Sequence, residues 1–469
     1  MSSPFNQEKY DTLLKGLEIS EVLFSNIDLG DRIDADYFTK ENLQIEQELK
    51  VQGAIELRKL ADFVASAFYP AATQLYDIGD TPFIRCVDCI NYPLITKKQD
   101  ESFEKIPISF VEENKGVSMI NRNDIVVTKV GTPCYASLVY EHDAVALSRT
   151  VMGLKNIHDI NPYYLLTFLR SKYGFSQLQR ARELTIQYQL TLERVKRILV
   201  YLPNDVFQKS IESIIQDSIK KQTLSQDVYS DAENILLSEL KIANWKPSNH
   251  PINIKRLKDS FTVSGRLDAE YYQTKYDDLF SLLSNYQCDL IKNIAHLKKS
   301  VEPGSDAYCD SGIPFVRVSD ISKYGIETPD IYLSPIEYKL EDLRPHKDTI
   351  LLSKDGSVGI AYKVTEDMNC ITSGALLHLN VFNEEYDPDY LTLILNSIIV
   401  QMQAERDSNG AIIQHWKPSD IEKVIIPKLP KPVQQTIASK IQESFKLRAD
   451  SKRLLEEAKR MVEAEIEKH

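Results

Sequence analysis

The sequence contains one unit twice. Short motifs recur in the same order in the two halves of the 469-residue chain, and the offset between matching positions drifts only from 234 to 224 and back to 227. A chain with this pattern folds as two copies of one structure, so each motif can be judged by what its counterpart keeps. The matching segments are 32–38 and 266–272, 82–88 and 314–320, 124–131 and 348–356, 161–165 and 387–391, 186–187 and 413–414, and 202–203 and 429–430.

Each copy begins with predicted strands. Runs rich in β-branched residues and bounded by turn residues predict strands. They lie at Thr81–Cys86 and Ile125–Thr128 in the first copy, and at Ile313–Val318 and Ile350–Ser353 in the second. A further short strand is predicted to end at Leu202-Pro203 or at Leu429-Pro430.

A helix follows the strands in each copy. Asn161-Pro162 and Asp387-Pro388 each precede an apolar run, the pattern of an Asx N-cap with proline at the first helical position. The segment Asn161-Pro162-Tyr163-Tyr164 is also one residue away from the N-P-P-Y motif of amino-methyltransferases. The second copy has Asp387-Pro388-Asp389-Tyr390, and no glycine-rich cofactor loop follows a strand. Capping explains both copies, so we expect helix starts and no methyltransferase site.

Each copy ends in a long amphipathic helix, near 206–242 and 433–468. Both stretches lack glycine and proline, and a lone surface helix of this length needs a partner for its apolar seam. We expect each helix to pack on the other, in an α+β fold with two α/β domains and an antiparallel coiled coil of two helices about 54 Å long. The apolar residues that define the two seams are Ile211, Ile215, Ile219, Tyr229, Ala232, Leu236 and Leu240, and Ile437, Ile441, Phe445, Leu455, Ala458, Val462 and Ile466.

The overall charge decides little. The chain has 56 Lys and Arg residues against 68 Asp and Glu, for a net charge of −12, and 43% hydrophobic residues. The hydrophobic fraction excludes global disorder. Phosphate contact is local, and residues 151–200 hold eight basic and three acidic residues. No segment approaches the roughly 18 apolar residues of a membrane span, and no secretory signal is visible, so we expect a cytoplasmic protein without a membrane partner.

The cysteines do not predict a metal site. Only Cys86 and Cys89 have C-x-x-C spacing, and a zinc site would need a second pair at suitable spacing. The second copy has Val318 and Ile321 at these positions. We therefore expect the two cysteines to pack in a half-buried strand and the chain to hold no metal.

Candidate contacts to nucleic acid follow strands in both copies. Lys129-Val130-Gly131-Thr132 and Lys354-Asp355-Gly356-Ser357 combine a basic side chain, a glycine and a hydroxyl, which suits close approach to a phosphate or a base edge. An ordinary turn is the alternative. Gln187 and Gln414 could pair bidentately with adenine, or could be solvated loop residues.

Basic residues elsewhere have two interpretations. Arg180, Arg182, Arg194, Lys196 and Arg197 form the most basic stretch, for which we favour phosphate contact. Arg85 and Arg317 could contact DNA, but each precedes an aspartate by three residues, so we favour internal pairs with Asp88 and Asp320.

The arrangement resembles the specificity subunit of type I restriction–modification systems over nearly the whole chain. The second copy carries the best local signatures: Gly410-Ala411-Ile412-Ile413-Gln414-His415, then Ile425-Ile426-Pro427-Lys428-Leu429-Pro430 and Val433-Gln434-Gln435. The first copy keeps Gln187, Leu202-Pro203 and Gln208, but has Glu183-Leu184 in place of the glycine.

The resemblance implies a protein without catalysis of its own. Each recognition domain would read one half of a bipartite target in double-stranded DNA, and the paired helices would set the gap between the halves. Two methylation subunits would carry S-adenosylmethionine, and a restriction subunit would use ATP and Mg; no cofactor is expected on this chain. The alternative is a scaffold of the same architecture that regulates methyltransferase partners without reading DNA.

The resemblance also places domains and contacts. The expected domains are 1–205 and 244–431 for target recognition, with long helices at 206–243 and 432–469. The candidate DNA-binding residues are Lys129, Thr132, Arg180, Arg182, Gln187, Lys354, Ser357, Gln414 and Lys417.

Overall fold

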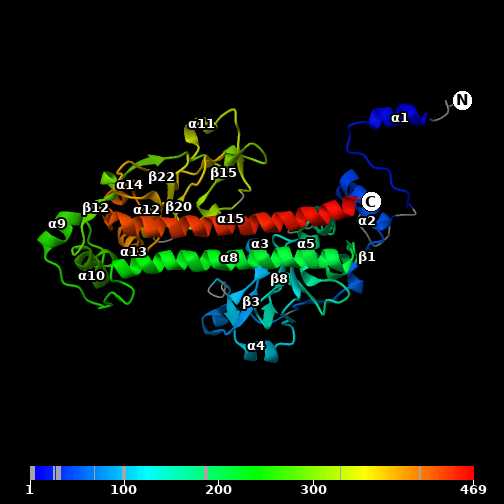
Figure 1. The fold of residues 1–469 in the computed structure, drawn as a ribbon, viewed down its shortest axis with the longest axis horizontal. Coiled ribbons are helices and arrows are strands. Elements are labelled where there is room, and N and C mark those ends of the chain that lie inside the picture. The colour runs from blue at the N-terminus through cyan, green and yellow to red at the C-terminus, as the bar shows by residue number, and fades with distance from the viewer. Residues whose placement is uncertain are drawn as a thin grey trace. The chain divides into compact units, whose positions relative to one another are not determined.

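The computed structural model describes residues 6–24, 27, 33–67, 69–97, 102–183, 188–327, 329–410 and 414–468. It divides into two compact units, of which unit 1 holds residues 1–220 and 450–469 and unit 2 holds residues 221–449. The boundary crosses both long helices, α8 (Asp205–Glu239) and α15 (Lys431–Glu467), so each unit contains part of each helix (Figure 1).

Unit 1 contains short strands and helices that precede α8 in the chain. Its strands are β1 Ile55–Glu56, β2 Asp62–Ala65, β3 Thr81–Ile84, β4 Leu94–Ile95, β5 Lys105–Ile106, β6 Met119–Asn121, β7 Ile125–Thr128, β8 Ala136–Val139, β9 Ala144–Leu147, β10 Val151–Lys155 and β11 Leu199–Val200. Its helices before α8 are α1 Gln7–Leu14, α2 Lys40–Val51, α3 Cys86–Asn91, α4 Ile108–Glu113, α5 Pro162–Arg170, α6 Lys172–Arg180 and α7 Leu192–Lys196.

Unit 2 follows the same plan between the two long helices. Its strands are β12 Cys288–Leu290, β13 Ala295–Lys299, β14 Tyr308–Cys309, β15 Ile313–Val316, β16 Ile321–Ser322, β17 Gly325–Ile326, β18 Tyr332–Leu333, β19 Ile350–Ser353, β20 Ala361–Lys363, β21 Ile371–Thr372, β22 Leu376–Val381 and β23 Ile425–Pro427. Its shorter helices are α9 Phe261–Ser264, α10 Thr274–Leu283, α11 Leu340–Leu343, α12 Pro388–Leu395, α13 Ile398–Asp407 and α14 Pro418–Ile421.

The two units share one sheet topology. The main sheet has the strand order β2-β10-β7-β8-β4 in unit 1 and β13-β22-β19-β20 in unit 2. In a second sheet, β3 pairs in parallel with β9 and β15 pairs in parallel with β21. The matching order confirms that the sequence repeat is a repeat of structure.

The predicted strands are found, but four of them end early. β11 ends at Val200 and β23 at Pro427, before the predicted ends at Leu202-Pro203 and Leu429-Pro430. β7 and β19 have the predicted bounds, whereas β3 and β15 each stop two residues sooner. The cause is local, because the Asp88 carboxylate accepts a hydrogen bond from the Arg85 amide at 2.8 Å and the Asp320 carboxylate does the same for Arg317. This contact turns the chain into α3 in unit 1 and into a short 3₁₀ turn in unit 2.

The early strand end corrects the prediction for the two cysteines. Cys86 and Cys89 lie in the helix α3, not in a strand. Cys89 is fully buried and Cys86 is half-buried, and burial raises the pKa of both thiols. Cys86 Sγ lies 3.2 Å from the Thr132 carbonyl oxygen. Packing remains the interpretation, but its setting is helical.

The predicted helix caps are confirmed. Asn161 Oδ1 accepts hydrogen bonds from the amides of Tyr163 at 2.9 Å and Tyr164 at 3.3 Å, and proline occupies the first turn of α5. Asp387 caps α12 in the same way, with the Asp389 amide at 2.8 Å. Both helices are largely buried against the main sheet of their unit.

A buried glutamine ties each long helix to a cap. Gln208 Oε1 accepts a hydrogen bond from the Asn161 amide at 2.8 Å, and Gln208 Nε2 donates to the Pro203 carbonyl at 2.9 Å. In unit 2, Gln434 Oε1 accepts from the Asp387 amide at 2.8 Å, and Gln434 Nε2 donates to the Leu429 carbonyl at 2.8 Å. These side chains fix where α8 and α15 begin.

A second glutamine in each unit completes the edge of a short strand. Gln177 Oε1 accepts from the Leu199 amide at 2.8 Å, and Gln177 Nε2 donates to the carbonyl of the same residue at 2.9 Å. Gln403 makes the same pair of bonds with Ile425, each at 2.9 Å. The amide thus satisfies the strand side that faces away from β1 or β12.

These bonds also correct the repeat alignment by one residue. The equivalent bonds show that Pro203 in unit 1 corresponds to Leu429 in unit 2, and that Gln177 corresponds to Gln403. Both pairs of positions have an offset of 226. The sequence match of Leu202-Pro203 with Leu429-Pro430 used an offset of 227 and is wrong by one position. The sequence alignment followed the identical Leu-Pro dipeptides, although the spacing of the surrounding glutamines indicates an offset of 226.

The two long helices pack antiparallel in each unit. In unit 2, α8 contacts α15 through Ser225 and Ser444, and through Asp231 and Lys440, whose carboxylate and ammonium groups lie 2.9 Å apart. In unit 1, Ser218 contacts Ser451. The predicted seam residues are buried there with few exceptions, and Leu455 and Phe445 are half-buried. The α+β class with paired long helices is confirmed (Figure 1).

Candidate functional site

Two loops come together in each unit, and both carry predicted contact residues. The Lys129 carbonyl accepts a hydrogen bond from the Leu190 amide at 2.8 Å, and the Lys354 carbonyl accepts from the Trp416 amide at 2.7 Å. Isolated antiparallel bridges join Val130 to Gln189 in unit 1 and join Asp355 to His415 in unit 2. The loop after β7 or β19 is therefore fixed beside the loop that precedes α7 or α14.

The glycines in these loops adopt a conformation that other residues disfavour. Gly131 has φ of 91° and Gly356 has φ of 73°, both in the left-handed region. Neither has atoms nearer than 3.8 Å around the place of a Cβ, so the space above the loop is open. The hydroxyl residues Thr132 and Ser357 are exposed next to them.

The two loop lysines differ in their charge environment. Burial lowers the pKa of Lys129, and among the described residues no acidic side chain forms an ion pair with it. Lys354 is nearly buried, and its ammonium contacts the Asp355 carboxylate. An unpaired, half-buried cation favours an external anion. Lys129 is thus available to one, whereas Lys354 is largely neutralised.

The second loop presents polar side chains in unit 2. Gln414 and Lys417 are exposed, and the Gln414 carbonyl accepts a hydrogen bond from the Gly356 amide at 2.9 Å. Gln187 lies outside the described residues. The bridges at Glu183–Gln189 and Asn409–His415 enclose loops of equal length, which places Tyr188 in unit 1 where Gln414 lies in unit 2. The predicted equivalence of Gln187 with Gln414 is wrong by one position.

Arg180 has an internal role that the sequence prediction missed. Its guanidinium lies 2.6 Å from a Glu46 carboxylate oxygen, donates to the Tyr37 carbonyl at 2.8 Å, and stacks 4.1 Å above the Tyr37 ring. The side chain is only 12% exposed. These contacts do not favour the predicted phosphate contact.

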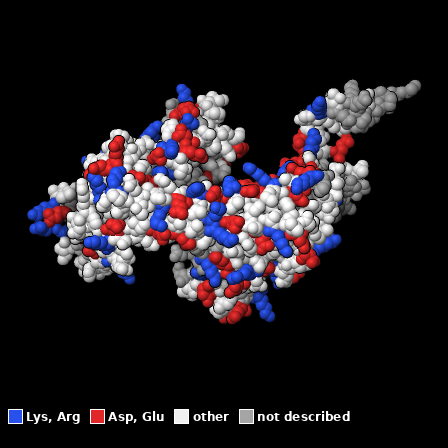
Figure 2. Space-filling view, viewed as in Figure 1, with Lys and Arg blue, Asp and Glu red and all other residues white. Residues whose placement is uncertain are grey.

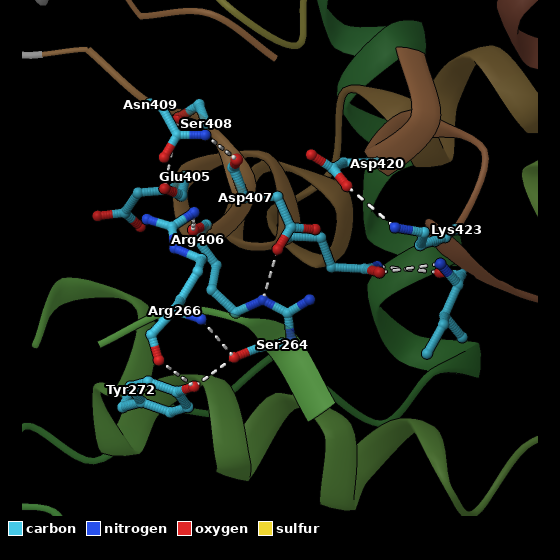
Figure 3. A network of polar contacts seen from close by, with 12 residues as sticks. Ser264, Arg266, Tyr272, Glu405, Arg406, Asp407, Ser408, Asn409, Asp420 and Lys423 are labelled. Carbon is cyan, nitrogen blue, oxygen red and sulfur yellow. Dashed lines mark hydrogen bonds and ion pairs between the residues drawn. The ribbon is translucent and has the colours of Figure 1, made fainter. Parts of the chain in front are cut away.

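Arg406 repeats this role in unit 2. Its guanidinium lies 4.8 Å from the Tyr271 ring and 4.4 Å from the Phe280 ring, and its Nε donates to Asp407 at 2.8 Å. Figure 3 shows this region, where Arg266 Nη1 also donates to the Arg406 carbonyl at 3.4 Å. Burial raises the pKa of Asp407. In both units an arginine at the end of α6 or α13 anchors the repeated motif that contains Tyr37 or Tyr271.

The remaining members of the basic stretch are partly engaged. The Arg182 guanidinium stacks 4.4 Å from the ring of Tyr188, which is 45% exposed. Arg194 lies 3.4 Å from Glu183, and Lys196 lies 2.6 Å from Glu193. Arg182 and Tyr188 line a surface pocket beside α6, so Arg182 stays near the candidate loops.

Arg85 and Arg317 form the internal pairs favoured from the sequence. Each Nε lies 3.4 Å from the aspartate three residues later, Asp88 or Asp320. Each also contacts a second carboxylate, Glu104 at 3.1 Å or Asp330 at 2.6 Å.

The unit 2 loops also bring together a carboxylate–imidazole pair that was not predicted from the sequence. His415 Nδ1 lies 2.8 Å from Asp355 Oδ1. Asp355 and His415 both lie in motifs that the sequence displays, but nothing in the sequence shows that the two loops meet.

The charges on the surface and the donor groups of the loops indicate which kinds of ligand the loops could bind. On the face drawn in Figure 2, cationic and anionic side chains are interspersed. Among the described residues, no group of three or more His, Cys, Asp or Glu side chains is placed to hold a metal ion. No helix within the described ranges is long and apolar enough to cross a bilayer. The loops instead offer backbone amides, hydroxyls, an amide side chain and lysines, which are donors to nucleic acid.

One family model matches the second copy of the repeat. Residues 285–460 match the family model described as "Type I restriction modification DNA specificity domain". This segment covers most of unit 2, and unit 1 repeats its topology. The match shows that this part of the chain is similar to the DNA specificity domains of type I restriction–modification systems.

Solved structures give weaker similarities. The chain is similar to the S subunit of a type I restriction-modification system from M. genitalium, with 12% identity, a TM-score of 0.37, and coverage of 87% of this chain and 92% of that one. It is also similar to the HsdS subunit from Thermoanaerobacter tengcongensis, with 17% identity, a TM-score of 0.28, and coverage of 75% and 81%. No curated protein matches the sequence.

Proposed function

We propose that each unit reads one half of a bipartite sequence in double-stranded DNA, with recognition domains at 1–205 and 244–431. The observation that carries the proposal is the repeated junction of two loops. In both units the loop with lysine, glycine and hydroxyl is joined by backbone hydrogen bonds to a second polar loop. Such a junction presents phosphate donors and base-edge donors together, on a scaffold of strands.

Individual residues take different parts in this proposal. Lys129, Thr132, Lys354, Ser357 and Lys417 suit phosphate contact, because they offer cations and hydroxyls beside open glycines. Gln414, and Gln187 by prediction, suit contact with a base edge. Arg182 stands beside these loops. Arg180 is left out of the proposed surface because its guanidinium is held internally.

The long helices α8 and α15 are proposed to set the non-specific gap between the two half-sites and to dock two methylation subunits. Those partners would supply S-adenosylmethionine chemistry, and a restriction subunit would supply cleavage with ATP and Mg. This chain would recognise the DNA sequence and would carry no cofactor.

Methylome sequencing of the host, with and without the gene, tests the proposal directly. One bipartite methylated motif should disappear when the gene is deleted. Replacing residues near 260–425 with those of a homologue should then change one half of the motif and leave the other half intact. Loss of both halves together would show that the units are not independent readers, and an unchanged methylome would refute DNA reading.

A further inference from the structure

In the loops of unit 2, the side chains of Lys354, Asp355 and His415 contact one another in a row. Asp355 lies at its centre, with the Lys354 ammonium on Oδ2 and the His415 ring on Oδ1, where Nδ1 is 2.8 Å away. His415 is 60% exposed, whereas Asp355 is 23% exposed. The imidazole therefore stands at the surface with its inner nitrogen held by a carboxylate.

The contact with Asp355 fixes which end of the ring faces outward. The carboxylate accepts a hydrogen bond from the Nδ1–H group, so Nε2 is the nitrogen that faces outward. Within the described ranges no side chain or carbonyl is bonded to Nε2 of His415. Among these residues Asp355 is the charged group in contact with the ring, and Lys354 is the charged group in contact with Asp355.

The backbone around His415 is held on both sides. The His415 amide donates to the Asn409 carbonyl at 2.7 Å, and the Asn409 amide donates back at 3.0 Å. The next residue, Trp416, is 1% exposed and its amide donates to the Lys354 carbonyl at 2.7 Å. A ring fixed at its backbone and at Nδ1 loses little freedom when it binds a ligand.

Resting on the proposed function, we infer that His415 binds a DNA phosphate through Nε2 and that Asp355 positions it. The doubly protonated ring donates from Nε2, and Asp355 compensates its charge together with that of Lys354. Two cations against one carboxylate leave the cluster positive, and the exposed Ser357 hydroxyl and Lys417 belong to the same two loops. A phosphate requires such a set of donors and positive charge.

The cluster belongs to unit 2 alone. Val130 and Gln189 stand at the bridged positions that Asp355 and His415 occupy in unit 2. The two units would thus hold the backbone of their half-sites with different groups. Unit 1 would use Lys129, which has no ion-pair partner in the described part of the chain, and unit 2 would use a histidine oriented by a carboxylate.

The chain itself provides a matched control. His346 and Asp367 form another exposed histidine–aspartate pair in unit 2, with Nδ1 3.4 Å from Oδ2 and 58% exposure of the histidine. His346 precedes β19, whereas Lys354 follows it, so this pair lies at the opposite end of the strand from the loops. Substitution there tests for a general effect of losing an exposed histidine.

The experiment measures binding of the assembled complex, purified on a tagged copy of this chain, to a duplex carrying its methylated motif. His415→Gln should weaken binding by roughly ten-fold, the worth of a hydrogen bond between charged groups. It should also flatten the slope of log affinity against log salt by about 0.9, the effect of one phosphate contact.

The companion variants separate positioning from contact and from folding. Asp355→Asn should weaken binding as well, because the ring is no longer held. His415→Lys should restore the affinity and the salt slope, because a lysine ammonium also binds a phosphate. His346→Gln should behave as wild type.

Two results would overturn the inference while leaving the proposed function intact. One is a His415→Gln complex with the wild-type affinity and salt slope. The other is a changed methylated base in one half-site, which would make His415 a base-reading residue. A wild-type complex that does not bind the duplex would instead refute both proposals.

Discussion

Ser218 and Ser451 each donate a hydroxyl hydrogen bond to the backbone carbonyl of the other, at 3.0 and 2.9 Å, within unit 1. In unit 2, Ser444 donates to the Ser225 carbonyl at 2.7 Å. All four serines are at most 3% exposed. Only a small side chain lets two helix backbones come within reach of a hydroxyl, so α8 and α15 approach each other closely at these residues.

A large residue at this contact should force the helices apart. Ser218→Leu should destabilise the protein by about 1–3 kcal/mol through overpacking, and Ser218→Ala by about 1 kcal/mol through one lost hydrogen bond. Urea unfolding followed by circular dichroism measures both. Ser230→Leu, on the exposed side of α8, is the control and should have little effect. Equal stability of the two leucine variants would contradict a close helix contact at Ser218.

The spacing of the serine contacts suggests how to lengthen the helix pair. The contacts are seven residues apart on each helix, so inserting seven residues between them in both α8 and α15 adds about 10.5 Å and nearly preserves the apolar face. Under the proposed function, the gap in the methylated motif should grow by about three base pairs of 3.4 Å, with both half-sites unchanged. Methylome sequencing reads the result. A gap of the original length in a folded, active variant would refute a spacing role for the helices.

Lys129 and Arg180 should separate contact from architecture. Lys129→Ala should leave stability almost unchanged but reduce the slope of log affinity against log salt by about 0.9. Arg180→Ala should cost about 1.5–3 kcal/mol, because it removes one of the two cations that contact the half-buried Glu46, the other being Lys50, and because it uncovers Tyr37. Salt titration of DNA binding and thermal unfolding of both variants check this. The reverse pattern would return Arg180 to the DNA surface.

Gln434 should be a stability determinant without contact to any ligand. Its side chain is fully buried and its amide bonds three backbone groups, those of Asp387, Leu429 and Glu385. Gln434→Ala leaves these groups unpaired and should cost about 2–4 kcal/mol. Gln435, which is exposed one residue later, is the control. A comparable melting temperature for the two alanine variants would contradict the proposed tie between α12 and α15.

His378 should make the stability fall in acid. Burial lowers the pKa of this histidine to about 4, and its Nε2 lies 2.7 Å from the Thr372 hydroxyl. Because the unfolded chain takes up the proton at its ordinary pKa near 6.5, the unfolded state binds more protons between the two values. Stability should therefore be constant above about pH 6.5 and decrease between about pH 6.5 and 4, by up to roughly 3 kcal/mol. Urea midpoints should show a weaker dependence over this range for His378→Asn.

The sequence predicts the elements of this protein better than their junctions. The repeat, the caps at Asn161 and Asp387, and the two long helices depend on local chemistry and on periodicity, which a sequence displays directly. The internal role of Arg180 depends on Tyr37 and Glu46, more than 130 residues earlier in the chain. The same holds for His415 and Asp355, which are 60 residues apart. Such partners are set by how loops meet, and no spacing rule encodes that.

The one-residue error in the repeat alignment has a physical origin as well. Leu-Pro matches Leu-Pro by identity, but the backbone positions are set by Gln208 and Gln434, which bond Pro203 and Leu429. A hydrogen bond to a backbone carbonyl does not depend on the type of residue that carries the carbonyl. The Leu-Pro dipeptide can therefore stand one position apart in the two units while the bonded backbone positions stay equivalent.

The glutamine side chains at the edges of β11 and β23 have a consequence for how such chains can diversify. Gln177 and Gln403 hold their strands by backbone atoms alone, and Gln208 and Gln434 do the same at the helix starts. At these positions the bonds reach backbone atoms only, so the side chains of Pro203, Leu429, Leu199 and Ile425 can change without loss of the bonds. The apolar residues of the long helices that pack in the core of each unit have no such freedom.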